Sequence, residues 1–278
     1  MEKPGAGVHS GAVSKPGDWE GDVVLADGAT VHMRAMRAED EARLAEMYEH
    51  LSADSVYYRF FSPVPRATAT SLEMNRLGDE GHAARVALLG DEIMAAARYD
   101  VVGPGVAEVA FVVADEHQGR GVGTLLLEHL AVIARSHGIH TFAADTLPNN
   151  AKMLGLFAAA GWERDCRFES GTVKTQFSIA PTPASMAAIA DREHIAEAAS
   201  MARLLSPRSV AVIGASRDPA KIGNAVLKNL LGQGFNGTVY PVNPHAESIG
   251  GVRSYATLAD VPGPVSYTHL TLPTNREV

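Results

Sequence analysis

Cysteine is nearly absent from this sequence: Cys166 is the single cysteine among 278 residues, so no disulfide can form within the chain. One free thiol and no disulfide framework favour a reducing compartment, and we expect a cytoplasmic protein. Long apolar runs are missing too, because no stretch reaches the roughly 18 apolar residues of a membrane span. The N-terminus has no apolar signal-peptide core. These absences argue against secreted and membrane-bound classes, and we expect no membrane partner.

Positive charge is also in short supply. The 24 Lys and Arg residues face 32 Asp and Glu residues, for a formal net charge of −8. A general nucleic-acid binder needs a basic surface, so we expect no nucleic-acid partner. The eleven histidines show no metal-ligand spacing, and no metal is predicted. Cys166 is interpreted as a small apolar residue rather than a nucleophile.

The length predicts two domains, at about 100–200 residues for each. Hydrophobic residues make up 46% and charged residues 20%, which is typical of a globular chain. Composition divides the sequence into a Gly- and Pro-rich leader expected to be disordered, a first domain, an Ala-rich linking helix, a second and incomplete domain, and a tail that resembles translated vector sequence. Their ranges are 1–21, 22–180, 181–205, 206–265 and 266–278.

Hydrophobic periodicity predicts an α/β protein. In the first domain, strands are expected at 22–36 around an Asp27–Gly28 turn, 84–90, 92–100, 107–114, 140–147 and 174–180. Helices are expected at 38–51, 52–61, within 115–138 with Gly138 as the stop, and at 150–161. The pair Glu128–His129 on one of them is interpreted as a solvated face. In the second domain, the strand–helix–strand order 209–216, 222–234 and 238–244 predicts a parallel β-α-β unit.

The most informative segment is the run Gln118-Gly119-Arg120-Gly121-Val122-Gly123, which stands between a predicted strand and a predicted helix. Glycines allow positive φ angles and close approach of the backbone. A turn of this kind at a helix N-terminus directs unpaired N–H groups toward one spot, which suits a pyrophosphate. The alternative is a tight connection that binds no ligand.

The order of elements around this run resembles the GNAT acyltransferase superfamily over about residues 22–180. The resemblance implies a mixed, splayed sheet with helices on both faces and acetyl-CoA as co-substrate. It also implies that main-chain groups of Val112 and Val113 hold the pantetheine arm, and that Asn150 contacts that arm besides capping a helix. The pyrophosphate would lie against the backbone of Gln118, Gly119, Arg120, Gly121, Val122, Gly123 and Thr124.

Acetyl transfer to an amine needs a proton acceptor, because a lysine ammonium has a reference pKa of about 10.4 and is not a nucleophile. A carboxylate can take that proton directly or through a water. Glu108 stands where similar family members carry their base; the alternative is an ordinary rim carboxylate. Phe157 stands where many relatives carry a tyrosine general acid, so we assign no acid.

The second domain resembles the CoA-binding region of NDP-forming acyl-CoA synthetases, through its Gly214-Ala215-Ser216 turn and its Tyr240–Pro244 stretch. The resemblance implies a second CoA site, expected to be incomplete here, at Gly214, Ala215, Ser216, Arg217 and Asn243. The turn has no Gly-x-Gly-x-x-Gly fingerprint, so no nicotinamide cofactor is expected. The ATP-grasp region of that family is absent from the sequence, so a complete ligase is not expected.

A GNAT domain joined to such a region is similar in layout to bacterial protein lysine acetyltransferases. We therefore expect direct acetyl transfer to protein lysines, with metabolic enzymes such as acyl-CoA synthetases as acceptors. Two alternatives stay open: acetylation of a small amine, and a non-catalytic sensor of CoA or acyl-CoA. Four aromatic residues could line an acceptor groove or pack beneath a loop: Tyr57, Tyr58, Phe60 and Phe61.

Overall fold

The computed structural model of the chain describes residues 19–262 and divides into two compact units, with the boundary between Ala196 and Glu197. The predicted tail, 266–278, lies outside the described residues, as does the leader up to residue 18. The remaining leader residues are ordered: Trp19 packs against the core and Gly21 begins the first strand. The predicted leader must therefore end before Trp19.

The first unit is built on an eight-stranded sheet in the order β1-β2-β3-β4-β5-β6-β8-β7. Neighbouring strands run antiparallel except β5 and β6, which run parallel, so the predicted mixed sheet is confirmed. The strands are β1 (Gly21–Val24), β2 (Thr30–Ala35), β3 (His82–Leu89), β4 (Glu92–Gly103), β5 (Val106–Val113), β6 (Thr141–Thr146), β7 (Arg164–Glu169) and β8 (Thr172–Ser178).

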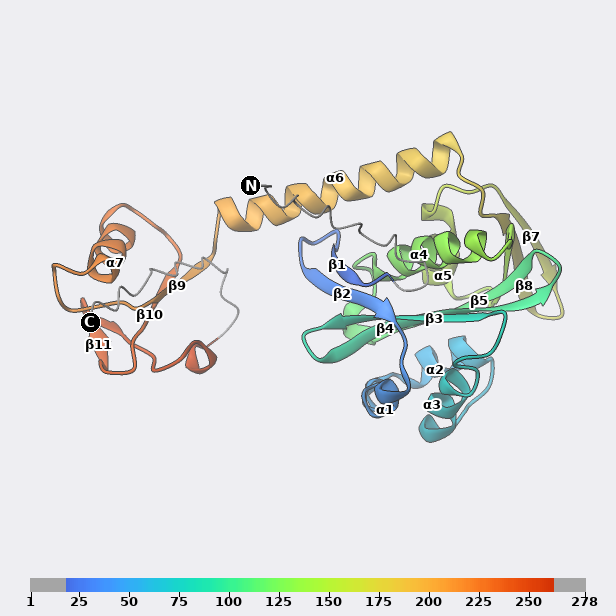
Figure 1. The fold of residues 1–278 in the computed structure, drawn as a ribbon, viewed down its shortest axis with the longest axis horizontal. Helices are drawn as coiled ribbons and strands as arrows, with labels where there is room; N and C mark the ends of the chain where they lie inside the picture. Colours follow the sequence, from blue (N-terminus) through green and yellow to red (C-terminus); the bar gives the residue numbers. More distant parts are fainter. Residues whose placement is uncertain (1–18, 263–278) are drawn as a thin grey trace, which may run out of the picture. The chain divides into compact units, whose positions relative to one another are not determined.

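Helices cover both faces of this sheet (Figure 1). One face carries α1 (Glu41–His50), α2 (Ala53–Phe60) and α3 (Arg66–Met74), and the other carries α4 (Val122–Ser136) and α5 (Ala151–Ala159). Short 3₁₀ turns, η2 (Ala38–Asp40) and η3 (Asp115–His117), precede α1 and follow β5. Each face has its own hydrophobic core. Leu126, Leu127 and Leu130 of α4 are fully buried in one, and Leu44 and Tyr48 of α1 in the other.

In the first unit, one helix and one strand are not predicted from the sequence, α3 and β7. Helix α3 is rich in Ala and Thr, and the residues that it buries are Ala69, Thr70 and Glu73. Its sequence therefore lacks the apolar stripe from which an amphipathic helix is predicted. Strand β7 is exposed along its whole length because it is the edge of the sheet, and it lacks the alternation of a half-buried strand. Cys166 lies on this strand and is exposed, which corrects its interpretation as an apolar packing residue.

The pair Glu128–His129 on α4 is not a solvated face, so that interpretation is wrong. Glu128 forms an ion pair with Arg192, and its side chain is 12% exposed. His129 stacks on Trp19, with ring centroids 4.4 Å apart. Burial, together with the charge of the nearby Arg85, lowers the pKa of His129 to about 4, so it is neutral at pH 7. Both side chains are anchored by segments distant in sequence, which spacing alone does not reveal.

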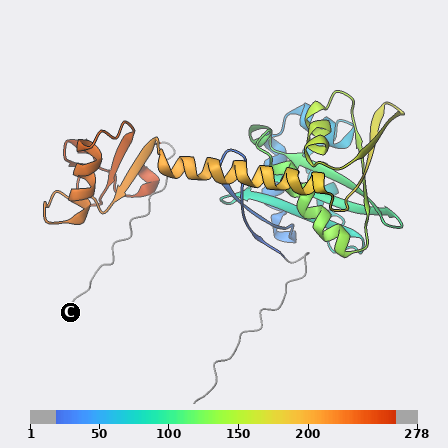
Figure 2. The same cartoon turned by 90° about the horizontal axis from the view of Figure 1, so that it is seen from above.

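The second unit contains the predicted β-α-β arrangement. Helix α6 (Pro183–Leu205) leads to β9 (Ser209–Ile213), α7 (Ile222–Gly232) and β10 (Thr238–Val242), followed by β11 (Ser248–Ile249), β12 (Val252–Arg253) and η4 (Leu258–Asp260). Strands β9 and β10 pair in parallel, which confirms the parallel unit, and α7 lies beside them (Figure 2). Leu227 of α7 packs on Val210, Val212 and Val239 of these strands.

A buried ion pair fixes the start of α1 to strand β2. Both Nη atoms of Arg34 donate to the Asp40 carboxylate at 2.7 Å, and the Asp40 side chain is fully buried. Burial by itself would raise the pKa of Asp40. The hydrogen bonds from Arg34 and from the Arg37 N–H, with the Arg34 charge, outweigh burial and hold that pKa below its usual value.

We predict that Asp40→Ala lowers the free energy of unfolding by about 3–5 kcal/mol at pH 7, because Arg34 is left buried without its counter-ion. Urea unfolding measures this change. The difference should shrink as the pH falls below about 4, since Asp40 in the parent then becomes protonated and loses its contribution. Glu39→Ala is the control, because its ion pair with Arg37 is exposed. Equal losses in the two variants would contradict the prediction.

Candidate functional site: a pocket where two parallel strands part

The pairing of β5 with β6 is short. It joins Val106 to Thr141, Ala107 to Phe142 and Glu108 to Ala143. Strand β5 runs on to Val113, and within the described strands no further ladder pair links it to β6. The sheet is therefore open in its middle beyond Glu108, and one edge of β5 is free to meet other groups.

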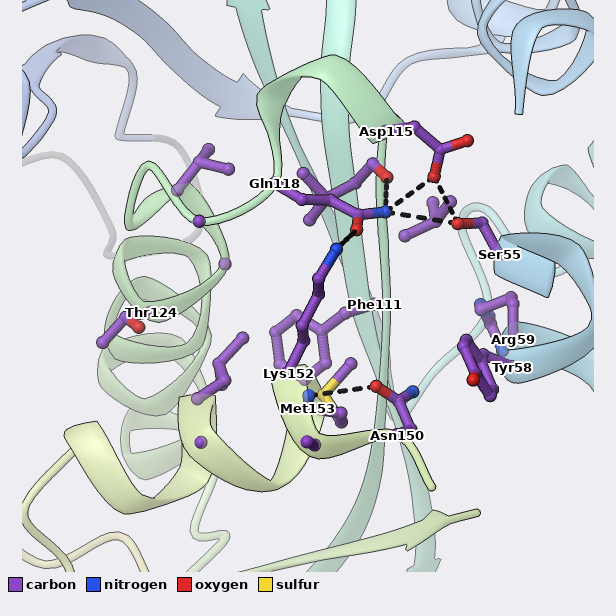
Figure 3. Close-up of a pocket in the computed structure, with 18 of the residues that line it drawn as sticks. Ser55, Tyr58, Arg59, Phe111, Asp115, Gln118, Thr124, Asn150, Lys152 and Met153 are labelled. Atoms are coloured by element: carbon purple, nitrogen blue, oxygen red, sulfur yellow. Dashed lines mark hydrogen bonds between the residues drawn. The ribbon is translucent and has the colours of Figure 1, made fainter. Parts of the chain in front are cut away.

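A pocket of about 730 Å³ lies at this opening (Figure 3). Its volume is within the usual range for small-molecule sites. Three structural parts bring its walls together: the end of β5, the glycine-rich turn with the first residues of α4, and the first turns of α5. Helix α2 adds a fourth wall through Ser55, Tyr58 and Arg59.

The glycine-rich turn has the backbone that its sequence predicts. Gly119 and Gly121 have φ angles of +79° and +88°, where a side chain would be strained. Gly121 caps α4 without a side-chain hydrogen bond, and Val122, Gly123 and Thr124 follow it in the pocket wall. The first N–H groups of a helix have no intrahelical acceptor, and the helix dipole adds partial positive charge there. The wall is suited to an anion.

Gln118 connects the walls of the pocket. Its Nε2 donates to the Val113 carbonyl at 3.2 Å and to Asp115 Oδ1 at 2.9 Å. Its Oε1 accepts from Lys152 Nζ of α5 at 2.7 Å. One backbone group of β5, the Val113 carbonyl, is thus satisfied by a side chain of the turn, and the turn is joined to α5.

Asp115 ties the same turn to α2. It accepts the Ser52 N–H at 2.6 Å and also accepts a hydrogen bond from the Ser55 hydroxyl. Burial alone would raise the pKa of Asp115, but the hydrogen bonds from Ser55 and Ser52 and the charge of Lys152 hold it below the usual value. Asp115 is therefore ionised at neutral pH and orients the start of α2.

The structure brings most of the expected cofactor residues into one pocket. Those that line the pocket are Val112, Val113, Gln118, Gly119, Gly121, Val122, Gly123, Thr124 and Asn150. Arg120 is not among the lining residues, because its side chain turns to the β1–β2 turn. In that turn, Arg120 Nε lies 2.7 Å from Asp27 Oδ2. Arg120 Nη1 also lies 3.0 Å from Nδ1 of His117, the last residue of η3.

Glu108 lies at the opening of the sheet rather than in the pocket wall. It belongs to the last pair that joins β5 to β6, and its side chain is exposed. In the antiparallel register with β4 its neighbour is Asp100. Glu108 shares its face of the strand with Val112, which does line the pocket.

Two further sequence expectations concern α5. The predicted helix cap is confirmed, since Asn150 Oδ1 accepts the Met153 N–H at 3.1 Å. Phe157 is buried, with its ring centroid 6.3 Å from that of Phe111 and 5.3 Å from that of Phe177. The position of the missing tyrosine is therefore part of the hydrophobic core.

The four aromatic residues of α2 and its C-terminus separate into different roles. Tyr58 lines the pocket (Figure 3). Phe60 packs on Tyr48, with ring centroids 6.2 Å apart. Tyr57 and Phe61 are 44% and 38% exposed.

Several pocket residues are not identified from the sequence. Each of them reaches the pocket only through contacts with segments distant in sequence. These residues are Ser55, Arg59, Asp115 and Lys152. Ser55 and Arg59 belong to the helix expected at 52–61, and the aromatic residues expected to line a groove there are the signal that could have found them. For Asp115 and Lys152 the sequence carries none, because their partners are 63 and 34 residues away.

The second predicted site forms a compact turn at the carboxyl ends of β9 and β10. Gly214 has a φ of +77°, and its N–H donates to the Val242 carbonyl at 3.0 Å. Asn243 Nδ2 donates to the Ala215 carbonyl at 2.6 Å. Ser216 and Arg217 complete the turn: the Ser216 carbonyl accepts from Asn224 Nδ2, and Arg217 Nε donates to the Ser248 carbonyl. Whether CoA binds here stays a prediction.

Residues 19–262 hold neither a cluster of metal ligands nor a membrane-spanning helix. No group of three or more His, Cys, Asp or Glu side chains within this range is placed to hold a metal ion. Within the same range, no helix has the length and apolar character needed to cross a membrane.

Comparison with known proteins matches the two parts of the chain to two families. Residues 44–162 match the acetyltransferase (GNAT) family, and residues 208–277 match a CoA binding domain. The second range runs into the predicted tail. The GNAT domain of a protein called PAT from S. lividans has a crystal structure that is 44% identical, with a TM-score of 0.54, and the match covers 58% of this chain and 97% of that one. The chain therefore belongs to the GNAT acetyltransferase family through its first unit.

Within that family, the chain is similar to a named acetyltransferase. It is 30% identical over 166 residues to acetyltransferase Pat of Mycolicibacterium smegmatis, a match that covers 57% of this chain and 49% of the relative. The second unit is 46% identical over 68 residues to the alpha subunit of an ADP-forming acetate–CoA ligase of Pyrococcus furiosus. The chain spans only 15% of that subunit and about half of Pat.

We predict that Gly223→Ala destabilises the second unit by about 1–3 kcal/mol, because an added Cβ would lie 2.0 Å from the Gly214 carbonyl oxygen. Amide hydrogen exchange of β9 and β10 should become faster, while exchange of β4 and β5 in the first unit stays unchanged. Gly232→Ala is the matched control, since a Cβ there has no neighbour within 4 Å among the described atoms. Unchanged exchange in Gly223→Ala would refute the close packing of α7 on the turn.

Proposed function

We propose that this chain transfers an acetyl group from acetyl-CoA to the side-chain amine of lysine residues in proteins. The observation that carries the proposal is the pocket itself: a turn whose glycines have positive φ angles, and which is suited to an anion, opens beside the part of β5 that has no β6 partner. The family match and the similarity to Pat support the same reading. The reducing compartment favoured by a single cysteine makes the cytoplasm the proposed location.

The long wall of the pocket suits the long shape of acetyl-CoA. The pyrophosphate would accept hydrogen bonds from the backbone N–H groups of the Gln118–Thr124 turn, where the dipole of α4 favours negative charge. The pantetheine amides would pair with main-chain groups of Val112 and Val113. Asn150 can contact the arm with its Nδ2, since its Oδ1 is occupied by the cap of α5.

Glu108 is the proposed general base. It stands at the point where β5 and β6 part, and it is exposed, so an acceptor can reach it from solvent. Glu108 would take one proton from the lysine ammonium, directly or through a water. The freed amine nitrogen then bonds to the thioester carbonyl carbon and gives up a second proton to solvent water. The carbon–sulfur bond breaks, and CoA leaves as a thiolate. Position 157 is a buried phenylalanine, so the side chain there offers no phenol to protonate that thiolate.

The acceptor is proposed to be a protein because the base is at the surface and Tyr58 of α2 borders the pocket, so a bulky partner can approach. Acyl-CoA synthetases are the proposed acceptors. An assay with acetyl-CoA tests this choice by comparing a whole-protein extract with a panel of small amines. Transfer to protein lysines supports the proposal. Transfer to small amines alone would make the chain a small-amine acetyltransferase, and binding without transfer would make it a sensor.

We predict that Glu108→Gln lowers the turnover number by about 10²–10⁴-fold, the usual effect of removing a general base, with little change in the affinity for acetyl-CoA. The remaining rate should rise with pH, since more of the acceptor amine is then unprotonated. Initial rates from pH 6 to 10 and a separate binding titration measure both effects.

Glu163→Gln is the matched control for Glu108→Gln, because Glu163 is an exposed glutamate of the loop after α5 and does not line the pocket. It should keep the parent rate and the parent pH profile. If Glu108→Gln does the same, Glu108 is a rim residue and the assigned base is wrong.

We predict that Gly121→Glu abolishes binding of acetyl-CoA, because the added carboxylate enters the phosphate wall and repels the ligand. Isothermal titration calorimetry measures the affinity, and thermal unfolding shows whether the variant is folded. Gly121→Ala separates the two effects, since it carries the same backbone strain at φ +88° without the charge. A folded Gly121→Glu with parent affinity would remove the cofactor from this pocket.

A further inference from the structure

Two cationic side chains line the pocket, Arg59 and Lys152. The Arg59 guanidinium is already occupied by an ion pair within the protein. Its side chain is 10% exposed, and its Nη2 lies 2.7 Å from Glu73 Oε1. Glu73 is itself almost fully buried and also binds the Tyr48 hydroxyl. The charge of Arg59 is therefore balanced inside the protein, and the guanidinium cannot leave without exposing a buried carboxylate.

Lys152 differs from Arg59 in its exposure to solvent and in the kind of group that it contacts. It is exposed on the first turn of α5, and its Nζ reaches across to Gln118 Oε1 at 2.7 Å (Figure 3). That acceptor is the oxygen of a neutral amide. A lysine ammonium bonds more strongly to an ionised oxygen than to a neutral one, and its flexible stem lets it change partners at small cost.

The position of Lys152 brings this ammonium to the anion-binding wall. Gln118 is the residue directly before the Gly119–Gly121 turn, and both belong to the same pocket wall. The nearby Asp115 is ionised and would repel a bound diphosphate. Arg120, the cation within the turn, is held by Asp27 at 2.7 Å and does not line the pocket.

We propose that Lys152 binds the 5′-diphosphate of the CoA ligand, and that its ammonium exchanges Gln118 for a phosphate oxygen when the ligand enters. This inference rests on the proposed function. It assigns Lys152 to affinity for the ligand rather than to the transfer step. The exchange replaces a neutral acceptor by a charged one, and it offsets the negative charge of Asp115 beside the diphosphate. Gln118 keeps its place in the wall through its bond to the Val113 carbonyl.

The test is a binding titration of Lys152→Met with three ligands: CoA, dephospho-CoA, which lacks only the 3′-phosphate, and pantetheine, which has no phosphate. We expect the dissociation constants of CoA and dephospho-CoA to rise by the same factor, about 10- to 100-fold, the size of one lost charge-assisted hydrogen bond. The affinity for pantetheine should be unchanged. Lys152→Arg should restore most of the binding, because it keeps the charge.

Lys228→Met is the matched control, since Lys228 is an exposed lysine on α7 of the second unit. It should bind all three ligands as the parent does. Parent-like binding of CoA by Lys152→Met would overturn the inference and leave the proposed function intact. A loss for CoA but not for dephospho-CoA would overturn the diphosphate assignment, because the contact would then be to the 3′-phosphate. Failure of the parent to bind CoA would contradict the proposed function itself.

Discussion

The feature on which the rest of the structure depends is the early end of the pairing between β5 and β6. After the pair Glu108–Ala143 the ladder stops, and the backbone of β5 needs other partners. Gln118 supplies one for Val113, and the turn that carries Gln118 begins α4. The opening therefore fixes both the place of the pocket and the position of its glycine-rich wall.

This opening is held between two separate hydrophobic cores. The core under α4 and α5 includes the aromatic contacts of Phe157, and the core under α1 to α3 includes Tyr48. Each helix that contributes to the pocket is thus anchored on its far side by apolar packing. Polar contacts across the pocket then set the finer geometry: Asp115 holds α2, and Gln118 bonds to Lys152 of α5.

Local signals predict much of this arrangement. The Asp27–Gly28 turn, the glycines of the Gly119–Gly121 turn and the Asn150 cap are each set by a few adjacent residues, so the sequence identifies them. The resemblance to a family adds the splayed sheet, which periodicity alone does not reveal. Neither local signals nor the family resemblance predicts contacts between distant segments, such as those of Asp115 with Ser52 and of Lys152 with Gln118. Burial of His129 against Trp19 escapes for the same reason.

The central claim is that acetyl-CoA lies where β5 and β6 part. Amide hydrogen exchange of the full chain, with and without acetyl-CoA, tests it most directly, because it reports on each backbone segment separately. The account predicts slower exchange on binding in residues 112–124 and 150–156, which form the walls of the pocket. Unchanged exchange in both segments, with slower exchange only at residues 214–217, would contradict it and place the ligand in the second unit.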